Sequence, residues 1–301
     1  MITGNPLRGK IDYTPELEGF EPRVVQLRTS DGLRLEAWEF YREPAPLTFV
    51  LAHGWGASKE MLDQQIVFLC REGWDVVAFD SRNHGNSEGR VSSVGYHETR
   101  DLEAAVAHVR SGTHLGQTVF LWGISMGAVA AIRVAERDPS IRGLIAESSY
   151  LSLRETVWHH VRLYFGFPLT VLAPLVLAWV RWRARFNTDD LDVARSVGRI
   201  TQTSAMFVAS EEDRRTPPAT ARRLAELCAG PHTRVFIAPH GEHACIFADN
   251  QVAYANEVRR FVGEALERGE RSPFAPTCGG NAADRPARRS KAIEADQSAD
   301  R

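Results

Sequence analysis

Six short apolar runs, separated by longer stretches with helical spacing, constrain the fold of this chain more than any other feature. The runs lie at residues 48–52, 76–79, 119–122, 144–146, 205–209 and 235–238. Uninterrupted apolar runs of this length are typical of strands that are buried on both faces of a parallel sheet. Stretches with apolar residues at helical spacing lie at 60–70, 98–109, 126–135, 220–228 and 258–266. Because strands and helices alternate, the sequence predicts an α/β fold with a mostly parallel sheet flanked by helices.

The same pattern divides the chain into parts. Residues 23–40 alternate apolar and polar side chains around a Ser-Asp-Gly turn, which predicts an antiparallel hairpin. Residues 150–196 carry no strand signal and are too many for an ordinary connection, so we expect a helical insertion, named here the lid segment. We predict an N-terminal arm (1–22), two parts of one core (23–149 and 197–270) around the lid segment, and a disordered tail (271–301).

Composition excludes several classes of protein. The chain has 301 residues, of which 44% are hydrophobic, and its net charge is -2, so it has enough apolar material for one large core. A balance this close to neutral argues against a nucleic-acid partner. The four cysteines form no CxxC pair and the ten histidines show no metal-ligand spacing, so we expect no metal and no other cofactor. Scattered thiols and a start unlike a secretory signal predict a cytoplasmic protein.

The sharpest motif is Gly123-Ile124-Ser125-Met126-Gly127, which follows one apolar run and opens a helical stretch. A G-x-S-x-G sequence between a strand and a helix is typical of a nucleophilic serine held on a sharp turn. Side chains two residues before and after the serine would crowd that turn, and glycine relieves it. The alternative, a chance pair of glycines around a helix cap, does not account for the strand and helix on either side. We therefore predict Ser125 as a nucleophile.

A serine hydroxyl is a weak nucleophile that needs a base. The last apolar run is followed by two histidines, His240 and His243. His243 is the better candidate because it lies deeper in the loop, just before the final helix. We expect His240 to be solvated or to support the site indirectly.

The histidine needs an acceptor that holds its tautomer and stabilises the imidazolium ion. The loop after residues 205–209 carries Glu211, Glu212 and Asp213, and Asp213 is our choice. The two glutamates are adjacent rivals, and a merely solvated acidic turn is the simpler interpretation. The chain order Ser125, Asp213, His243 is the one expected for a serine on such a turn.

Attack on a carbonyl places negative charge on its oxygen, which N–H donors must meet. One donor would be the backbone N–H of Met126, directly after the serine. The second should come from the loop after residues 48–52, which reads His53-Gly54-Trp55-Gly56, and the N–H of Trp55 is our candidate. Glycines in this loop would let the backbone approach a substrate closely.

The order and context of these motifs resemble the α/β-hydrolase superfamily, and within it the bacterial serine aminopeptidase-like or lysophospholipase-like hydrolases. Residues 80–87, Asp-Ser-Arg-Asn-His-Gly-Asn-Ser, resemble the D-x-R-G-H-G-x-S loop of that group. The resemblance covers about residues 23–266 and departs at Asn83 and Ser210, where the group usually has glycine. It implies an acyl-enzyme mechanism without a cofactor. For residues 80–87 we favour a structural role over a catalytic one.

Residues 163–180 contain no charge and are flanked by Arg162 and Arg181. Eighteen such residues are just enough to cross a bilayer. However, one glycine and two prolines interrupt any single helix there. A crossing would also put Ser125 on one side of the membrane and the acid and base on the other. We therefore favour a lid, and peripheral contact with a membrane through residues 163–180 stays open as a variant.

These inferences converge on a serine hydrolase that cleaves carboxylic esters of a small-molecule acyl substrate. An aminopeptidase or amidase and a thioesterase would use the same three side chains and remain alternatives. A non-catalytic or membrane-associated binding protein on the same scaffold is a further alternative, since a fold does not prove a function. The sequence leaves the oligomeric state open.

Overall fold

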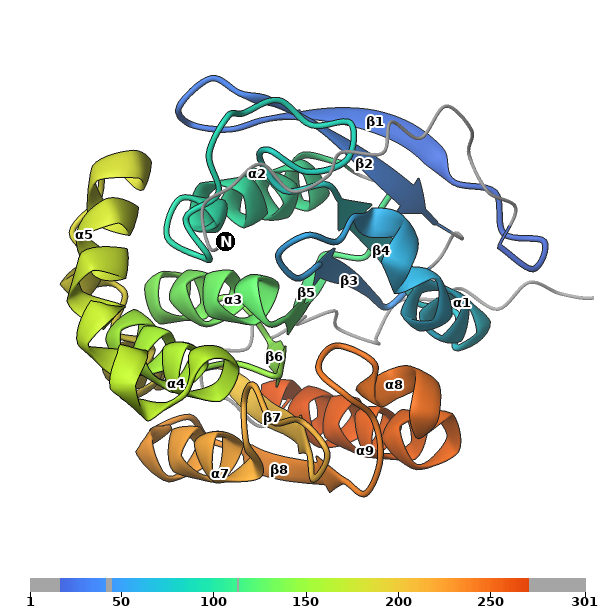
Figure 1. Ribbon diagram of the computed structural model, residues 1–301. Coiled ribbons are helices and arrows are strands. Elements are labelled where there is room, and N and C mark those ends of the chain that lie inside the picture. The colour runs from blue at the N-terminus through green and yellow to red at the C-terminus, as the bar shows by residue number, and fades with distance from the viewer. Residues whose placement is uncertain (1–16, 42–44, 113, 271–301) are drawn as a thin grey trace, which may run out of the picture.

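The computed structural model describes residues 17–41, 45–112 and 114–270, so the predicted tail and residues 1–16 of the arm lie outside it. The described strands form one sheet in the order β1-β2-β4-β3-β5-β6-β7-β8 (Figure 1). The strands are β1 (Arg23–Arg28), β2 (Arg34–Phe40), β3 (Leu47–Ala52), β4 (Asp75–Phe79), β5 (Thr118–Ile124), β6 (Gly143–Glu147), β7 (Ser204–Ser210) and β8 (Thr233–Ala238). Each apolar run singled out in the sequence lies within one of these strands, so the predicted fold class is confirmed.

Strand direction also follows the sequence pattern. The alternating segment forms the antiparallel hairpin β1–β2, and β2 pairs antiparallel with β4. The other neighbouring strands, from β4 through β3 to β8, pair in parallel. The hairpin turns at Gly32, whose φ of 89° is a conformation that glycine adopts without strain.

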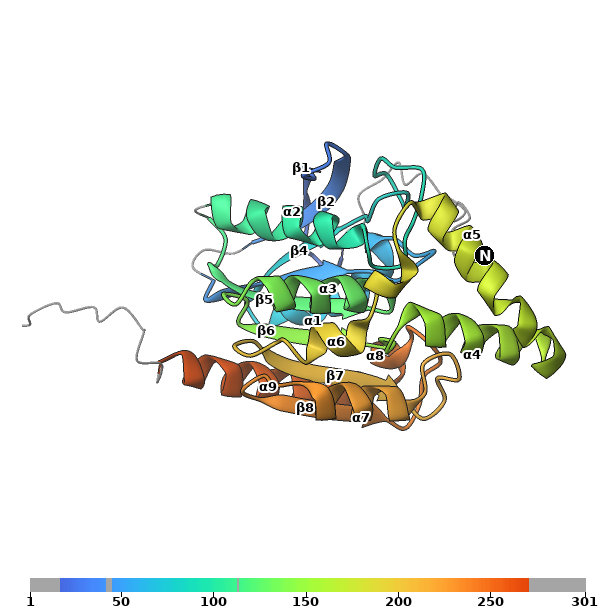
Figure 2. The same ribbon diagram turned by 90° about the vertical axis from the view of Figure 1, so that its left-hand side faces the viewer.

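Helices cover both faces of the sheet (Figures 1 and 2). On one face lie α2 (Glu98–Ser111), α3 (Met126–Arg137) and α7 (Pro218–Leu227); on the other lie α1 (Asp63–Arg71), α8 (Ile246–Asp249) and α9 (Gln251–Glu270). Successive strand residues alternate between the two cores: Leu121 belongs to one, and Phe120 and Trp122 belong to the other. Burial on both faces explains why the central strands read as continuous apolar runs.

The lid segment is helical, and its glycine and prolines divide it as expected. It contains α4 (Leu153–Phe165), the 3-10 helices η2 (Phe167–Leu172) and η3 (Thr188–Asp190), α5 (Ala173–Ala184) and α6 (Val193–Val197). Helix α4 ends at Gly166, whose φ is 83°, and prolines stand in the first turns of η2 and α5, where their missing N–H is not needed. None of the helices in the described part of the chain is both long and apolar enough to cross a membrane.

The lid segment stands at one edge of the sheet. Figure 2 shows α4 and α5 beyond the end of the sheet towards which the arrow of β7 points. This is the edge at which the parallel strands end, so the loops after β5, β6, β7 and β8 meet beneath the lid segment. In open α/β sheets this edge is where ligands bind.

Candidate active site

Three side chains that are far apart in the sequence meet at the carboxyl edge of the sheet. The Ser125 hydroxyl lies 2.9 Å from Nε2 of His243, and Nδ1 of His243 lies 2.9 Å from Oδ2 of Asp213. Ser125 follows β5, Asp213 follows β7 and His243 follows β8. In this arrangement the carboxylate accepts a hydrogen bond from the Nδ1–H group. Nε2 then carries no proton and can accept the proton of the serine hydroxyl.

The turn that carries Ser125 is strained and depends on its glycines. Ser125 has φ 53° and ψ -110°, a conformation that non-glycine residues rarely adopt. A Cβ atom on Gly123 would lie 2.3 Å from the carbonyl oxygen of Gly127, and one on Gly127 would lie 2.1 Å from that of Ala52. Both contacts are with backbone atoms that cannot swing aside, so the steric reason given for the motif holds.

The two proposed donors for a substrate oxygen are the N–H groups of Met126 and Trp55. Met126 is next to Ser125 in the sequence, and the loop with Trp55 is close to it in space. Met126 is the first residue of α3, and a Cβ on Gly54 would lie only 3.5 Å from the Cβ of Ser125. The loop with Trp55 therefore passes beside Ser125. Neither the Trp55 N–H nor the Met126 N–H has a backbone acceptor among the described residues, which leaves both available to a ligand.

Asp213 is held by donors on every side. Its Oδ1 accepts the N–H groups of Arg215 and Thr216 at 2.9 and 3.0 Å, and its Oδ2 accepts the hydroxyls of Thr216 and Ser148 at 2.6 and 3.0 Å. Burial opposes ionisation, but the hydrogen bonds from His243 and Thr216 outweigh it and lower the pKa of Asp213 to about 2. The carboxylate therefore stays charged at neutral pH.

Sequence reasoning missed both supporting hydroxyls. Thr216 follows Asp213 by three residues, and this spacing allows an aspartate to accept backbone N–H groups two and three residues on, so the signal was present. Ser148 lies 65 residues before Asp213, at the end of β6, and only the pairing of β6 with β7 brings it there.

The two rival acids, Glu211 and Glu212, and the second histidine, His240, lie outside the series of contacts from Ser125 through His243 to Asp213. Glu211 is exposed and makes no contact with His243, while Glu212 accepts the Gly241 N–H at 2.8 Å and lies 3.3 Å from His240. The side chain of His240 is 67% exposed. Glu212 and His240 thus join the loop after β7 (residues 211–217, named here the acid loop) to the loop after β8 (residues 239–245).

Residues 80–87 brace the loop that carries Trp55. Nε2 of His84 accepts the Gly56 N–H at 3.1 Å, and Nε2 of His53 accepts the Ser81 N–H at 3.0 Å. Burial lowers the pKa of His53 to about 4, so its ring is neutral and Nε2 is free to accept. These contacts agree with the structural role expected for residues 80–87.

A buried ion pair anchors the same loop. Lys59 has no exposed side-chain surface, and its Nζ lies 2.7 Å from Oδ2 of Asp80. Asn83, where glycine was expected, has φ 63°, which asparagine tolerates better than most residues. Ser210 has no positive φ, so this position does not require glycine.

A buried carboxyl group, that of Glu147, lies behind Ser125. The backbone oxygen of Glu147 accepts the Ser125 N–H at 2.8 Å, and its Oε2 accepts the hydroxyl of Tyr254 at 2.9 Å. Burial raises the pKa of Glu147 to about 7, although the Tyr254 hydrogen bond acts in the opposite direction. No sequence signal pointed to this residue.

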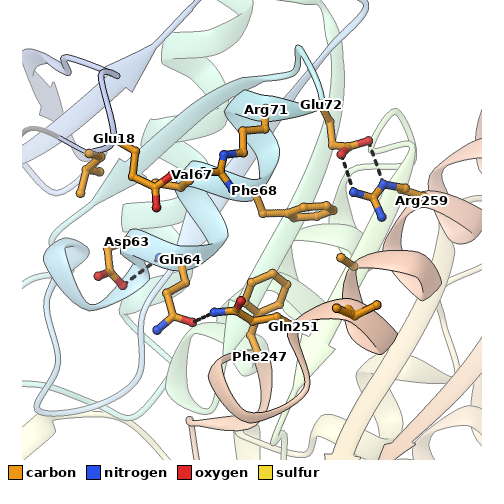
Figure 3. Close-up of a pocket in the computed structure, with 13 residues that line it drawn as sticks. Glu18, Asp63, Gln64, Val67, Phe68, Arg71, Glu72, Phe247, Gln251 and Arg259 are labelled. Carbon is orange, nitrogen blue, oxygen red and sulfur yellow. Dashed lines mark hydrogen bonds and ion pairs between the residues drawn. The ribbon is translucent and has the colours of Figure 1, made fainter.

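A pocket of about 510 Å³ lies elsewhere, between α1 and the helices α8 and α9 (Figure 3). Its polar groups pair with one another, because Gln64 bonds to Gln251 and Glu72 bonds to Arg259. It therefore offers no convergent polar set for a ligand. Among the described residues, no group of three or more His, Cys, Asp or Glu side chains is placed to hold a metal ion.

Comparisons with known proteins agree with the observed fold. The family model described as serine aminopeptidase, S33, matches residues 44–191. The uncharacterized protein YqkD of Bacillus subtilis is 24% identical over 253 residues, which cover 83% of this chain and 82% of that protein. The uncharacterized membrane protein YNL320W of Saccharomyces cerevisiae is 26% identical and covers 78% of both chains. The Pyrococcus furiosus esterase Pf2001 matches in fold with a TM-score of 0.70 at 23% identity, over 88% of this chain and 98% of the esterase.

Proposed function

We propose that this chain is a serine hydrolase of the α/β-hydrolase superfamily that cleaves carboxylic esters, because the serine aminopeptidase model matches residues 44–191 and the esterase Pf2001 has a similar fold. The observation that carries the proposal is the unbroken series of contacts from Ser125 through His243 to Asp213, each 2.9 Å long. A hydroxyl, an imidazole and a buried carboxylate in this order are the parts that nucleophilic acyl transfer requires.

The mechanism follows from these contacts. His243 takes the Ser125 proton as the serine oxygen attacks the acyl carbonyl, and the N–H groups of Trp55 and Met126 hold the oxyanion. His243 then protonates the leaving alcohol, and an acyl-enzyme remains. Water, activated by the same histidine, attacks the acyl-enzyme and releases the acid. Asp213 stabilises the imidazolium ion that forms in each step.

An ester is favoured over a peptide by the charges near the site. An aminopeptidase holds the ammonium group of its substrate, which calls for a free carboxylate near the serine. Among the acids of the loop after β7, Asp213 is occupied by His243, Glu212 accepts the Gly241 N–H and faces His240, and Glu211 lies 4.0 Å from Arg222. The next residues of the acid loop are Arg214 and Arg215, which suit neutral or anionic substrates better. The esterase Pf2001, similar in fold, is in line with this preference.

The experiment is active-site labelling together with hydrolysis of model substrates. We expect a fluorophosphonate probe to label the protein and the protein to hydrolyse p-nitrophenyl esters. Ser125→Ala should abolish both, while Ser111→Ala, at the exposed end of α2, should change neither. Labelling that persists in Ser125→Ala would refute the assignment.

The same assay separates the alternative functions. A chain-length series of p-nitrophenyl esters, an acyl thioester and an aminoacyl p-nitroanilide should be compared at equal concentration. We expect the ester to have the highest kcat/KM. A protein that folds but neither labels nor hydrolyses any of them would be a binding protein on this scaffold. The cytoplasmic location expected from the sequence stays a prediction.

A further inference from the structure

The lid segment presents a large apolar surface to solvent. Ten of the fifteen exposed large hydrophobic side chains among the described residues lie between residues 158 and 182. Six of these are 59–76% exposed and are named here the lid patch: Tyr164, Phe165, Phe167, Val171, Leu175 and Trp182. Soluble monomers rarely gather this many exposed apolar side chains in one segment unless the segment binds something.

Helix α5 is apolar on both of its faces, which sets it apart from an ordinary surface helix. Its inner face packs into the core through residues spaced three or four apart: Ala173, Leu177, Val180 and Ala184. The opposite face carries Leu175, Trp179 and Trp182, again at helical spacing, and all three are exposed. An ordinary surface helix has charged or polar residues there. Because the inner face is already packed, rotation of the helix cannot bury the outer one.

Within residues 156–188 the charged side chains are all of one sign. The sequence has no aspartate or glutamate between residues 156 and 188, but it has Arg162, Arg181, Arg183 and Arg185. None of these arginines forms an ion pair within the described residues; the one side-chain hydrogen bond that they form there goes from Arg183 to the backbone oxygen of Arg90. The apolar side chains are therefore flanked by cations that pair with no carboxylate among the described residues.

We propose that the lid patch rests on the surface of a lipid bilayer that contains anionic headgroups. Apolar side chains would enter the acyl boundary while the arginines meet phosphate or carboxylate groups, as in helices that lie in the interface plane. Tryptophan and tyrosine, both present here, are the side chains enriched at that depth. Helices α4 and α5 lie on the bilayer because neither is long enough to cross it.

Charge favours a lipid surface over a second copy of the chain. A symmetric dimer brings the same patch of both copies together, and here it would bring two sets of unpaired arginines together as well. Like charges close to one another in an interface oppose association. An anionic lipid surface neutralises them instead.

The lid patch lies at the end of the molecule that holds the proposed active site (Figure 2). Helix α4 contacts the acid loop directly, since the ring nitrogens of His159 and His160 lie 2.8 and 3.3 Å from the backbone oxygens of Arg214 and Arg215. A surface-bound molecule would therefore turn Ser125 towards the bilayer. If the proposed function holds, its substrates are acyl esters that reside in lipid; the lipid contact itself does not depend on that function.

The test is flotation of the purified full-length protein with vesicles. We would compare vesicles of phosphatidylcholine alone with vesicles that also contain phosphatidylserine. The variant Phe167→Ser/Val171→Ser/Leu175→Ser should lower the partition coefficient by about 1,000-fold, since each buried side chain of this size changes it by about tenfold. The matched control is Met61→Ser/Val252→Ser, which removes apolar side chains of equal exposure elsewhere and should bind as the unmodified protein does.

A second variant tests the electrostatic part separately. Arg162→Gln/Arg181→Gln should weaken binding to vesicles with phosphatidylserine by about fivefold per arginine and leave binding to phosphatidylcholine unchanged. The proposal is overturned if the unmodified protein fails to float with either vesicle, or if the triple variant floats equally well. It is also overturned if light scattering shows a dimer that the triple variant dissolves while no vesicle binds, because the patch then joins two copies. Labelling by the fluorophosphonate is scored independently, so failure of the proposed function is distinguishable.

Discussion

Replacement of Asp213 by asparagine should disable His243 by reversing its tautomer. The Oδ1 position accepts two backbone N–H groups, from Arg215 and Thr216, so the amide oxygen must take that position. The amide NH₂ group then faces Nδ1 of His243, where Oδ2 now accepts. An NH₂ group donates and cannot accept, so Nδ1 must lose its proton and Nε2 must carry it. A protonated Nε2 cannot take the proton of Ser125.

The expected magnitude is large for activity and small for stability. In a serine triad the wrong tautomer lowers kcat by about 10⁴-fold, which is about 5 kcal/mol in activation free energy. Asp213 has a folded pKa of about 2 against an ordinary value of 3.8, so its ionised form contributes about 2 kcal/mol of stability above pH 4. That contribution disappears as the pH falls towards 2. The variant lacks it at pH 7 but should stay folded.

The assay is steady-state hydrolysis of a p-nitrophenyl ester at pH 7, with thermal melting of the same samples. Glu211→Gln is the matched control, because Glu211 lies in the same loop, is exposed and does not contact His243. We expect the control to keep full activity. The reasoning fails if folded Asp213→Asn keeps more than about a tenth of the activity, or if Glu211→Gln loses as much.

Three further changes test the packing around the site, each by urea unfolding. Gly127→Ala should lower the free energy of unfolding by about 3 kcal/mol, because the new Cβ meets the Ala52 oxygen at 2.1 Å. Gly263→Ala is the control: its new Cβ has nothing within 4 Å, so it should raise the free energy of unfolding slightly. Equal effects of the two changes would contradict this reasoning. Lys59→Met should cost about 3–5 kcal/mol by leaving Asp80 buried without its partner, and adding Asp80→Asn should recover part of it. The raised pKa of Glu147 makes the unmodified protein lose stability as the pH rises from 4.5 to 8, and Glu147→Gln does not lose it. The free energy of unfolding of Glu147→Gln minus that of the unmodified protein should therefore rise by roughly 3 kcal/mol over this interval. A difference that does not change with pH would refute the shift.

Local signals in the chain predicted the strands and the nucleophile. The buried strands were readable because a strand covered on both faces must be apolar throughout, as β5 and β7 are. The turn at Ser125 was readable because its glycines are required by contacts within a few residues or with the next strand. The supports of Asp213 were only partly readable: Thr216 acts through local spacing, whereas Ser148 reaches Asp213 only through the neighbouring strand.

The lid segment likewise has some features that the sequence predicted and others that only the structure shows. The lack of charge in residues 163–180 and the glycine and prolines there were visible in the sequence, and these helix breaks argued against a single spanning helix. Which apolar side chains face the core was not visible, because a helix that is apolar all round has no periodic signal to orient it. Packing of α5 against the core selected Leu177 and Val180 for burial and left Leu175 and Trp182 in solvent.

The sequence by itself determined which segments become strands, where the chain turns at Ser125, and which residue types can carry acyl transfer, because these depend on hydrophobic pattern and local sterics. Only the tertiary structure decided that Asp213 rather than Glu211 or Glu212 meets His243, and that an apolar, cation-bordered surface lies beside the site. The physical reason is that sheet order and helix packing set distances between residues that no local pattern encodes.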